Sequence, residues 1–246
     1  MTAEYRIYPY GDVALIVETT QEISEESYRR IRCLSMLLKS EGPDAVRELI
    51  PAYCSLLVVY DPLEADYAEM EATVRAFAER AETVAPTERQ VVRVPVCYEG
   101  NFAPDIQDVA RHAGLSPEEI VNLHSSGTYL IYMLGFTPGF PYLGGMTERI
   151  AAPRKSSPRV KIPAGSVGIA GSQTGIYPQE SPGGWNIIGR TPAVLFDPVR
   201  EPPALFRAGQ YIRFYPIDSR QYETLEREAA RGAWMPETEY IAGDSK

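Results

Sequence analysis

The chain has 246 residues, of which 44% are hydrophobic and 23% are charged, as in an ordinary globular protein with its own core. Its 24 basic and 33 acidic side chains leave a net charge of −9 without any cluster of Lys and Arg, which argues against nucleic acid and anionic membranes as partners. No run approaches the roughly 20 apolar residues of a membrane span, and the polar segment 2–10 after Met1 predicts no signal peptide, so a cytoplasmic protein is expected.

The first third of the chain alternates strand and helix patterns. Residues 5–18 predict a buried strand entered through the turn at Gly11, and Ser24 caps a helix that ends near Gly42. Two short strands, a second helix and a further strand follow, and the order β-α-β-β-α-β predicts a ferredoxin-like α/β sandwich, which we assign to residues 1–88. These later elements are expected at Val46–Pro51, at Ser55–Tyr60, from Tyr67 to Ala81 and at Gln90–Tyr98.

Residues 89–246 predict a β-barrel or a β-sandwich with helices at its start and at its end. Pro104 opens a short helix, and Ser116 with Glu119 forms a capping box that starts the next helix, which ends near His124. From there on, short strands alternate with glycine and proline turns. The strands are expected at Tyr129–Leu134, Gly165–Ala170, Trp185–Ile188, Ala193–Phe196 and Gln210–Tyr215, and the last helix at Ser219–Arg231.

Glycine and proline concentrate in residues 135–192, which hold 11 of the 19 Gly and 8 of the 21 Pro. Tight turns between barrel strands explain about half of these glycines. Turn chemistry does not explain the polar and aromatic side chains beside them, and loops that carry such side chains on a rigid barrel are typical of binding sites. The segment therefore predicts a surface for a ligand and a partner. These side chains are Phe140, Tyr142, Gln173, Thr174, Tyr177 and Trp185.

Three motifs of this segment resemble those of the family of 5-oxoprolinase B subunits, also called KipI-like or allophanate hydrolase subunit 1. They begin at Gly135, Pro163 and Gln173 and read GFTPGFPYLGG, PAGSVGIAG and QTGIYP. The resemblance covers essentially the whole chain, with a departure at Lys161, where the family pattern is expected to have Arg. It implies an α+β protein with a small N-terminal domain followed by a cyclophilin-like β-barrel, in agreement with the division above.

The resemblance implies one component of a bacterial ATP-dependent 5-oxoprolinase, which opens 5-oxo-L-proline to L-glutamate while ATP is hydrolysed. It further implies two partners, a KipA-like C subunit and an A subunit of the lactam-utilisation type. This chain would supply part of a shared active site and be inactive alone, with ATP and Mg acting in the assembled enzyme and no cofactor held by this chain. Two alternatives stay open: an inhibitor of a sporulation histidine kinase, as in one named relative, and a component of an allophanate or urea carboxylase-type enzyme.

His124 is the candidate catalytic base, because imidazole transfers protons near neutral pH and this residue stands at a helix end just before the barrel. A capping or solvated histidine explains its position equally well. Neither His124 nor His112 has a second ligand at a usable spacing, so no metal site is expected. Cys33, Cys54 and Cys97 are scattered and odd in number, which argues against a disulfide framework.

The loop ahead of the central glycine-rich motif carries three cations, Arg154, Arg159 and Lys161. Guanidinium groups bind carboxylates in bidentate geometry, so these residues are candidates to hold the carboxylate of 5-oxoproline or an acyl phosphate, although a solvated basic loop explains them as well. The stretch 171–175 is glycine-rich but lacks the Gly-Lys-Ser/Thr ending of a phosphate loop, so it does not predict ATP binding.

Two further groups of candidates come from the glycine- and proline-rich segment. Hydrogen-bonding side chains are expected to hold an amide or lactam, and aromatic side chains to wall the pocket, with a core role as the alternative for the tryptophan. The first group is Gln173, Thr174 and Tyr177, and the second is Phe140, Tyr142 and Trp185.

Overall fold

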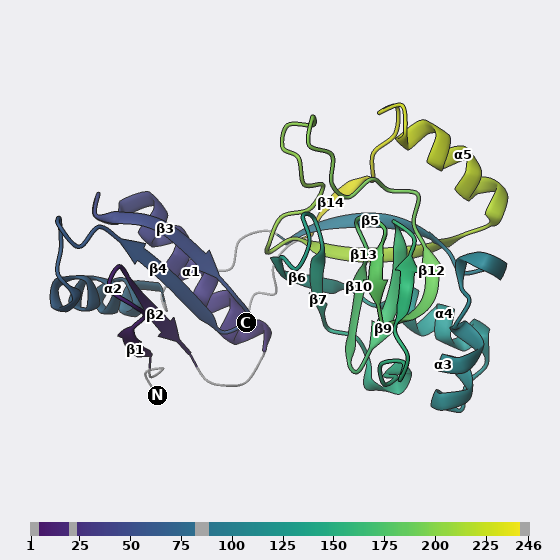
Figure 1. The fold of residues 1–246 in the computed structure, drawn as a ribbon, viewed down its shortest axis with the longest axis horizontal. Coiled ribbons are helices and arrows are strands. Elements are labelled where there is room, and N and C mark those ends of the chain that lie inside the picture. The colour runs from purple at the N-terminus through teal and green to yellow at the C-terminus, as the bar shows by residue number, and fades with distance from the viewer. Residues whose placement is uncertain (1–4, 20–23, 82–88, 242–246) are drawn as a thin grey trace. The chain divides into compact units, whose positions relative to one another are not determined.

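The computed structural model describes residues 5–19, 24–81 and 89–241. These residues form two compact units, one ending at Ala81 and one beginning at Arg89 (Figure 1). Each unit has a hydrophobic core of its own. None of the helices in the described ranges is long and apolar enough to cross a membrane.

The first unit is a four-stranded antiparallel sheet with two helices. Helix α1 (Glu25–Glu41) begins at Ser24, whose side chain accepts a hydrogen bond from the backbone N–H of Ser27, as predicted from the sequence. Strand β4 (Ser55–Tyr60) alternates buried and half-buried side chains, as a strand with one well-covered face does. The other elements are β1 (Arg6–Pro9), β2 (Ala14–Glu18), β3 (Val46–Pro51) and α2 (Tyr67–Ala81).

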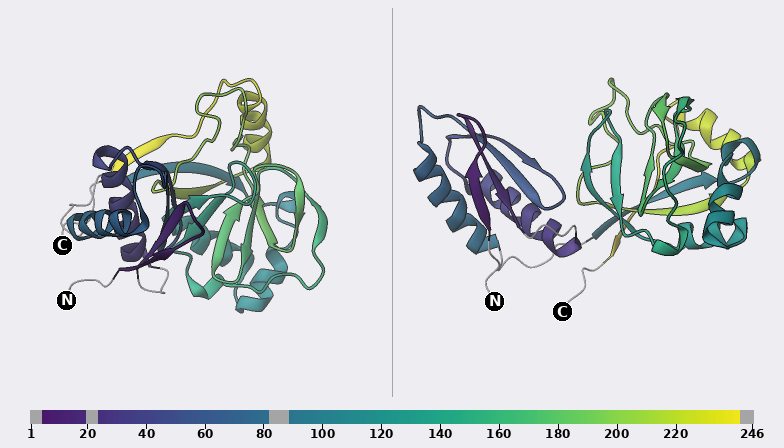
Figure 2. Two further views of the ribbon diagram at one scale, coloured as in Figure 1. Left: turned by 60° about the vertical axis from the view of Figure 1, so that its left-hand side comes forward. Right: turned by 60° about the horizontal axis from the view of Figure 1, so that its bottom comes forward.

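Both helices of this unit pack against the same face of its sheet (Figure 2, right). Their apolar side chains, among them Leu34 from α1 and Val74 from α2, meet Leu15 and Leu56 from the strands in one cluster. All four side chains are fully buried, so the helical spacing read from the sequence does mark the inner faces of α1 and α2.

The strand order in this sheet is β1-β2-β4-β3, which differs from the predicted ferredoxin-like order. Strand β4 lies between β2 and β3 as predicted, but the edge beside β2 is occupied by β1, from the start of the chain. The strand expected at 90–98 to complete this sheet lies in the second unit instead. Its side chains Val92, Val94 and Val96 are buried in the barrel core, and its pairing partner lies over a hundred residues further along the chain. Local patterning predicted the strand correctly but could not indicate its partner.

The second unit is a closed barrel of seven strands, which confirms the α+β class and the barrel. Strand β5 (Arg89–Cys97) runs parallel to β13 (Tyr211–Ile217), and a pairing of Arg190 with Cys97 closes the ring between β12 and β5. The order around the ring is β5-β13-β6-β7-β10-β9-β12. The remaining strands are β6 (Tyr129–Leu134), β7 (Pro141–Gly144), β9 (Ser166–Ala170), β10 (Gln173–Ile176) and β12 (Asn186–Arg190).

Short strands accompany the barrel. Strand β14 (Thr238–Ile241) pairs with β5, where the sequence predicts only a polar tail, and β8 (Arg159–Ile162) pairs with β11 (Ser181–Gly183) as a separate two-stranded sheet. The strand predicted at 193–196 was wrong, because this segment forms only an isolated bridge from Phe196. Strands β7, β8, β10 and β11 were not predicted, because three or four residues are too few to show an alternating pattern.

Three α-helices and two single-turn helices pack around the barrel. Helix α4 (Pro117–Ser126) begins with the predicted capping box, in which Ser116 and Glu119 exchange side chain-to-backbone hydrogen bonds of 3.2 and 2.8 Å. Helix α3 (Ile106–Ala113) lies beside α4 at one end of the barrel, whereas α5 (Ser219–Ala229) packs against β5 (Figures 1 and 2). The single turns are η1 (Gly100–Phe102) and η2 (Glu148–Ile150).

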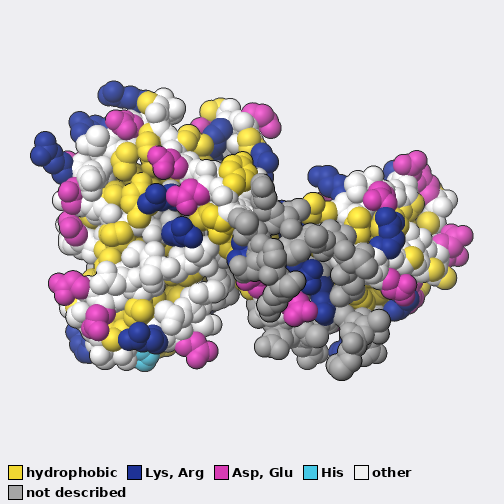
Figure 3. All heavy atoms as spheres, turned by 180° about the vertical axis from the view of Figure 1, so that it is seen from behind, with side chains coloured by type: hydrophobic (Ala, Val, Ile, Leu, Met, Phe, Trp, Pro, Cys, Tyr) yellow, Lys and Arg dark blue, Asp and Glu magenta, His cyan; other side chains and the backbone are white. Residues whose placement is uncertain are grey.

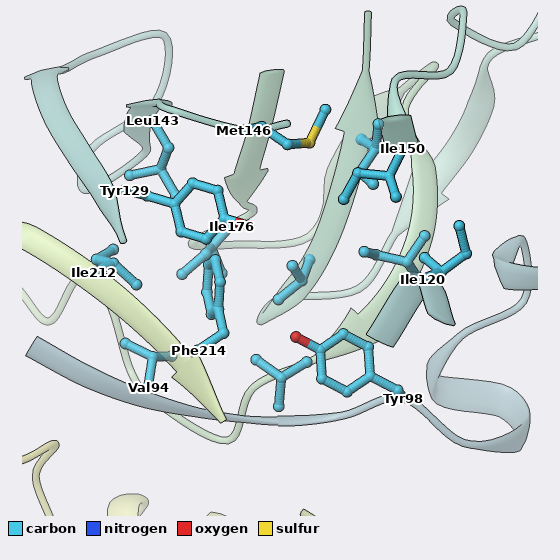
Figure 4. Packing of buried hydrophobic residues seen from close by; sticks show 14 of the residues in the cluster. Val94, Tyr98, Ile120, Tyr129, Leu143, Met146, Ile150, Ile176, Ile212 and Phe214 are labelled. Atoms are coloured by element: carbon cyan, nitrogen blue, oxygen red, sulfur yellow. The ribbon is translucent and has the colours of Figure 1, made fainter. Parts of the chain in front are cut away.

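The barrel interior is almost entirely apolar, with aromatic rings from several elements. Figure 4 shows Tyr98, Tyr129 and Phe214 pointing into this interior among aliphatic side chains such as Ile176 and Ile212. The two tyrosines also carry hydroxyl groups into the core, and a buried hydroxyl needs a hydrogen-bond partner. These partners determine where His124 lies.

Candidate functional site

His124 lies inside the barrel unit with no exposed surface, and both of its ring nitrogens are hydrogen-bonded to buried hydroxyls. Its Nδ1 lies 2.8 Å from the Tyr98 hydroxyl and its Nε2 lies 2.9 Å from the Thr174 hydroxyl. Because Thr174 donates its own proton to the carbonyl of Gly168 at 3.1 Å, its oxygen accepts from Nε2–H, and Nδ1 accepts from Tyr98. The ring also stacks on Phe214, with the two ring centroids 4.6 Å apart.

Burial lowers the pKa of His124 from about 6.5 to about 3, because the cation would lose its hydration in the core. Burial likewise raises the pKa of Tyr98 well above its usual value, so both partners are neutral at pH 7. Neither ring nitrogen faces solvent. This environment favours a structural role, in which neutral His124 joins α4 to the barrel, over the predicted role as catalytic base. Thr174, predicted to bind substrate, is also fully buried and is part of the same network.

The predicted aromatic residues come together in a second, smaller cluster. The ring centroids of Phe140 and Tyr142 are 5.1 Å apart, and those of Phe140, Tyr177 and Trp185 are 5.8–6.3 Å apart, all edge to face. Tyr177 follows Ile176, which belongs to the barrel core, so the alternation along β10 places this cluster on the opposite face of the sheet. Phe140, Tyr177 and Trp185 are each less than 10% exposed, which favours the core role for Trp185.

Glycines of the segment allow the aromatic rings to lie directly on the backbone. A Cβ added to Gly175 would lie 3.1 Å from the Trp185 ring and 3.2 Å from the Phe140 ring, closer than ordinary packing permits. At Gly183 an added Cβ would overlap the Tyr177 hydroxyl. These glycines are therefore needed for packing, and they explain much of the glycine density beyond turns.

Arg159 is bound within the protein by a carboxylate that sequence reasoning missed. Asp105, whose side chain is only 2% exposed, accepts hydrogen bonds of 2.8 and 2.6 Å from the two terminal nitrogens of Arg159, and 2.7 Å bonds from Lys155 and from the backbone N–H of Ile187. Burial alone would raise the pKa of Asp105, but these hydrogen bonds outweigh it and hold the pKa below its usual range. This internal pairing occupies the guanidinium that was predicted to grip substrate.

The other two predicted cations differ in their pairing. Lys161 forms an exposed ion pair of 2.9 Å with Glu180. On the face drawn in Figure 3, basic and acidic side chains are intermingled. Arg154 is exposed and makes no ion pair with any described residue, and its charge acts on the nearby Tyr177 hydroxyl, whose pKa is raised by burial and lowered in part by Arg154. Of the three cations, only Arg154 is free of a carboxylate partner within the described residues.

Arg154 lines an open cleft of about 340 Å³ between α3 and residues 152–157. Val109 and Ala152 give the cleft a partly apolar wall, and Asn186 is the only polar lining residue that is buried. Such a mixture of apolar wall and few polar groups is typical of small-molecule sites. The remaining lining residues are Asp108, His112, Pro153, Lys155, Ser156 and Ser157.

The cleft contains one predicted substrate-binding residue, Arg154, and several other polar groups that the predictions omitted. Gln173 is half-buried at the start of β10 and does not line the cleft. Asp105 and Asn186 were missed because the hydrogen-bond partners of the Asp105 side chain lie 50 or more residues away and those of the Asn186 side chain 17 or more, and no local motif marks either residue. Within the described residues, no group of three or more His, Cys, Asp or Glu side chains is placed to hold a metal ion.

The sequence and the structure of this chain were compared with those of known proteins. Residues 5–206 match the family model described as carboxyltransferase domain, subdomain C and D. The chain is 44% identical over 240 residues to the 5-oxoprolinase B subunit of Bacillus subtilis, covering 93% of this chain and 100% of that protein. It is 48% identical to a conserved uncharacterized protein of Pyrococcus horikoshii, with a TM-score of 0.53 over 88% of this chain and all of that one.

The fold extends to much larger proteins. The structure of Kluyveromyces lactis urea carboxylase aligns with 97% of this chain at a TM-score of 0.74, but at 18% identity, and this chain spans only 24% of that protein. At that identity the likeness concerns the fold alone, because one fold hosts many functions.

Proposed function

The chain belongs to the carboxyltransferase domain, subdomain C and D family, and from this membership we propose that it is the B subunit of a 5-oxoprolinase. The observation that carries the proposal is the 44% identity to the 5-oxoprolinase B subunit of Bacillus subtilis, which extends over the whole of that protein. Neither the kinase inhibitor nor the urea carboxylase component is favoured; the matched putative urea carboxylase is 31% identical over only 58% of this chain and 12% of its own length.

The reaction of the assembled enzyme is the ring opening of 5-oxo-L-proline coupled to ATP hydrolysis. One water adds across the lactam C–N bond to give L-glutamate, and a second is consumed as ATP becomes ADP and phosphate. A lactam carbonyl is unreactive, so its opening needs activation through a nucleotide and a general base. This chain holds and orients the cyclic amide in part of a shared site, while the KipA-like C subunit and the lactam-utilisation A subunit supply the remaining groups.

The glycine-rich stretch 171–175 does not fit a nucleotide phosphate. Residues 173–176 form strand β10 within the barrel, and Thr174 points into the core and hydrogen-bonds His124. A phosphate loop instead presents its backbone N–H groups and hydroxyl to solvent at a helix N-terminus. This misfit supports the proposal that ATP binds to one of the partner proteins and that this chain is inactive by itself.

The test is reconstitution from purified subunits. This chain alone, each pair of subunits and the complete set are incubated with 5-oxoproline and ATP, and glutamate and ADP are measured together. Equal release of both products only by the complete set is the expected result. Full turnover by the isolated chain would contradict the shared site, and turnover with urea in place of 5-oxoproline would transfer the chain to the carboxylase class.

A further inference from the structure

We propose that the cleft between α3 and residues 152–157 is a binding site for a cyclic amide that carries a carboxylate, with Asn186 accepting the lactam N–H and Arg154 binding the carboxylate. The inference rests on the proposed function for the identity of the ligand, 5-oxoproline, but its geometry comes from the cleft alone. It assigns a role to Asn186 that no sequence motif indicated.

The side-chain amide of Asn186 is held in one orientation. Its Nδ2 donates one hydrogen bond of 2.8 Å to the carbonyl of Pro153 and another of 3.2 Å to the carbonyl of Ile169. An amide nitrogen has two hydrogens, so both donors are used and the positions of Oδ1 and Nδ2 are settled by their partners.

The Oδ1 atom of Asn186 is consequently the free end of this amide. It makes no hydrogen bond to any described residue, although Asn186 is only 7% exposed. The buried side-chain atoms without partners in the described ranges are one nitrogen each of Arg30 and Arg190 and the Ser166 hydroxyl, and Asn186 Oδ1 is not one of them. The oxygen therefore retains some exposed surface, and we place that surface on the cleft that Asn186 lines, where Oδ1 is a fixed acceptor for an external N–H donor.

Arg154 supplies the positive charge of the cleft. The neighbouring cations already bind carboxylates, because Lys155 and Arg159 share Asp105 and Lys161 pairs with Glu180. Arg154 has no such partner among the described residues, and its guanidinium suits a carboxylate in bidentate geometry. The exposed hydroxyls of Ser156 and Ser157 line the same cleft and can donate to the lactam carbonyl.

A planar lactam with a carboxylate matches this set of groups. Its N–H, C=O and carboxylate require an acceptor, a donor and a cation, and the cleft offers all three beside an apolar wall of Val109 and Ala152. A site that hydrogen-bonds a substrate N–H discriminates strongly against an analogue that lacks it, since the buried acceptor then stays unpaired. The arrangement therefore predicts selectivity at two positions of the ligand.

Binding is tested first on the full chain by ¹⁵N-resolved NMR with 5-oxoproline at millimolar concentration. We expect the side-chain NH₂ signals of Asn186 and the backbone signals of Ser156 and Ser157 to shift with the ligand. N-methyl-5-oxoproline, which lacks the lactam N–H, and 5-oxoprolinamide, which lacks the carboxylate, should produce much smaller shifts. Absence of any shift at these residues with 5-oxoproline would overturn the inference, whether or not the assembled enzyme turns over.

The second test uses the reconstituted complex with Arg154→Gln. Hydrogen bonds to a charged group contribute about 10- to 100-fold in affinity, so KM for 5-oxoproline should rise by that factor with a smaller change in kcat. The preference of the wild-type complex for 5-oxoproline over 5-oxoprolinamide should fall to near one in the variant, which a merely structural role of Arg154 would not cause. Arg227→Gln on α5, an exposed arginine far along the chain, is the matched control and should retain wild-type kinetics.

The two proposals fail in different ways. If the wild-type complex turns over 5-oxoproline and Arg154→Gln leaves KM and the ligand preference unchanged, the cleft is not the substrate site, while the function stands. If the complex shows no turnover but the NMR shifts and their selectivity appear, the function fails and the cyclic-amide site stands. Substitution of Asn186 is not needed for either conclusion, which matters because its two donated hydrogen bonds contribute to folding.

Discussion

Two buried polar residues, Asp105 and His124, connect segments of the barrel unit that lie far apart in sequence. Asp105 joins the start of α3 to β8 through Arg159 and to β12 through Ile187. His124 joins the end of α4 to the end of β5 through Tyr98 and to β10 through Thr174. In both networks, removal of one side chain leaves the polar groups that it contacts buried without a hydrogen-bond partner, which is unfavourable.

Asp105→Asn should destabilise the protein by about 2–4 kcal/mol at pH 7, somewhat less than a fully buried ion pair because the Lys155 and Arg159 side chains are 26% and 31% exposed. The pKa of Asp105 is lowered in the folded state, so its stabilisation is present above the unfolded pKa near 4 and is lost as the pH falls below it. Urea unfolding at pH 7 measures the loss, with Glu180→Gln as a control that removes only an exposed pair. Equal stability of the two variants would contradict the assigned role.

His124→Gln should reduce the loss of folding stability that occurs as the pH falls below about 6.5. The pKa of His124 is about 3 when folded and about 6.5 when unfolded, so between these values the unfolded state binds more protons and stability falls as the pH falls. The wild type should therefore lose about 2 kcal/mol more than the variant between pH 6.5 and pH 5, as measured by urea unfolding at both pH values. His112→Gln, which keeps His124, is the control and should lose as much stability as the wild type between the two pH values. If His124→Gln also showed the same pH dependence as the wild type, a buried neutral His124 would be excluded.

At the level of secondary-structure elements, strand β9 is flanked by two glycines with positive φ that differ in their surroundings. Gly165, at +77°, precedes the strand, and an added Cβ there would overlap the carbonyl oxygen of Thr191. Gly171, at +59°, follows it and has no atom within 4 Å of the Cβ position. Positive φ explains glycine at both ends, but close packing of the backbone explains it only at Gly165.

Gly165→Ala should accordingly be much more damaging than Gly171→Ala. A left-handed conformation costs a non-glycine residue about 1–2 kcal/mol, which applies to both variants. Overlap with a backbone oxygen adds roughly 1–3 kcal/mol at Gly165, because backbone cannot move aside as a flexible side chain can. Thermal unfolding of the two variants side by side provides the measurement. Similar losses at the two positions would contradict the packing explanation.

At the level of the whole molecule, the two units have separate hydrophobic cores that share no residue. Both tryptophans, Trp185 and Trp234, lie in the second unit, whereas far-UV circular dichroism reports on both units. Tryptophan fluorescence therefore follows the barrel unit alone.

Leu34→Ala in α1 should lower the stability of the first unit by about 3 kcal/mol, since Leu34 is fully buried and a cavity remains. We expect the circular dichroism transition in urea to begin earlier while the fluorescence midpoint stays unchanged. Ile169→Val in β9 is the reciprocal variant and should lower the stability reported by fluorescence by about 1 kcal/mol. A parallel shift of both signals in Leu34→Ala would show a single cooperative unit instead.

The sequence by itself determined the elements whose causes are local. Ser24 at the start of α1, the Ser116 and Glu119 capping box of α4 and the apolar run of β6 each depend on residues within about four positions, and all were predicted close to their observed places. The glycine- and proline-rich segment also drew attention to the candidate site through Arg154, and it carried the resemblance to the family, whereas its aromatic side chains form a cluster that does not line the cleft.

Only the tertiary structure decided which elements pair and which polar groups remain free. Strand β5 belongs to the barrel because it pairs with β13, over a hundred residues away along the chain, and no local pattern in the sequence indicates this partner. Arg159 and Arg154 look alike in sequence, yet Asp105 occupies the first and leaves the second for a ligand. His124 became a neutral core residue and Asn186 an oriented acceptor for the same reason: burial and hydrogen bonding depend on groups brought together by folding, not on neighbours along the chain.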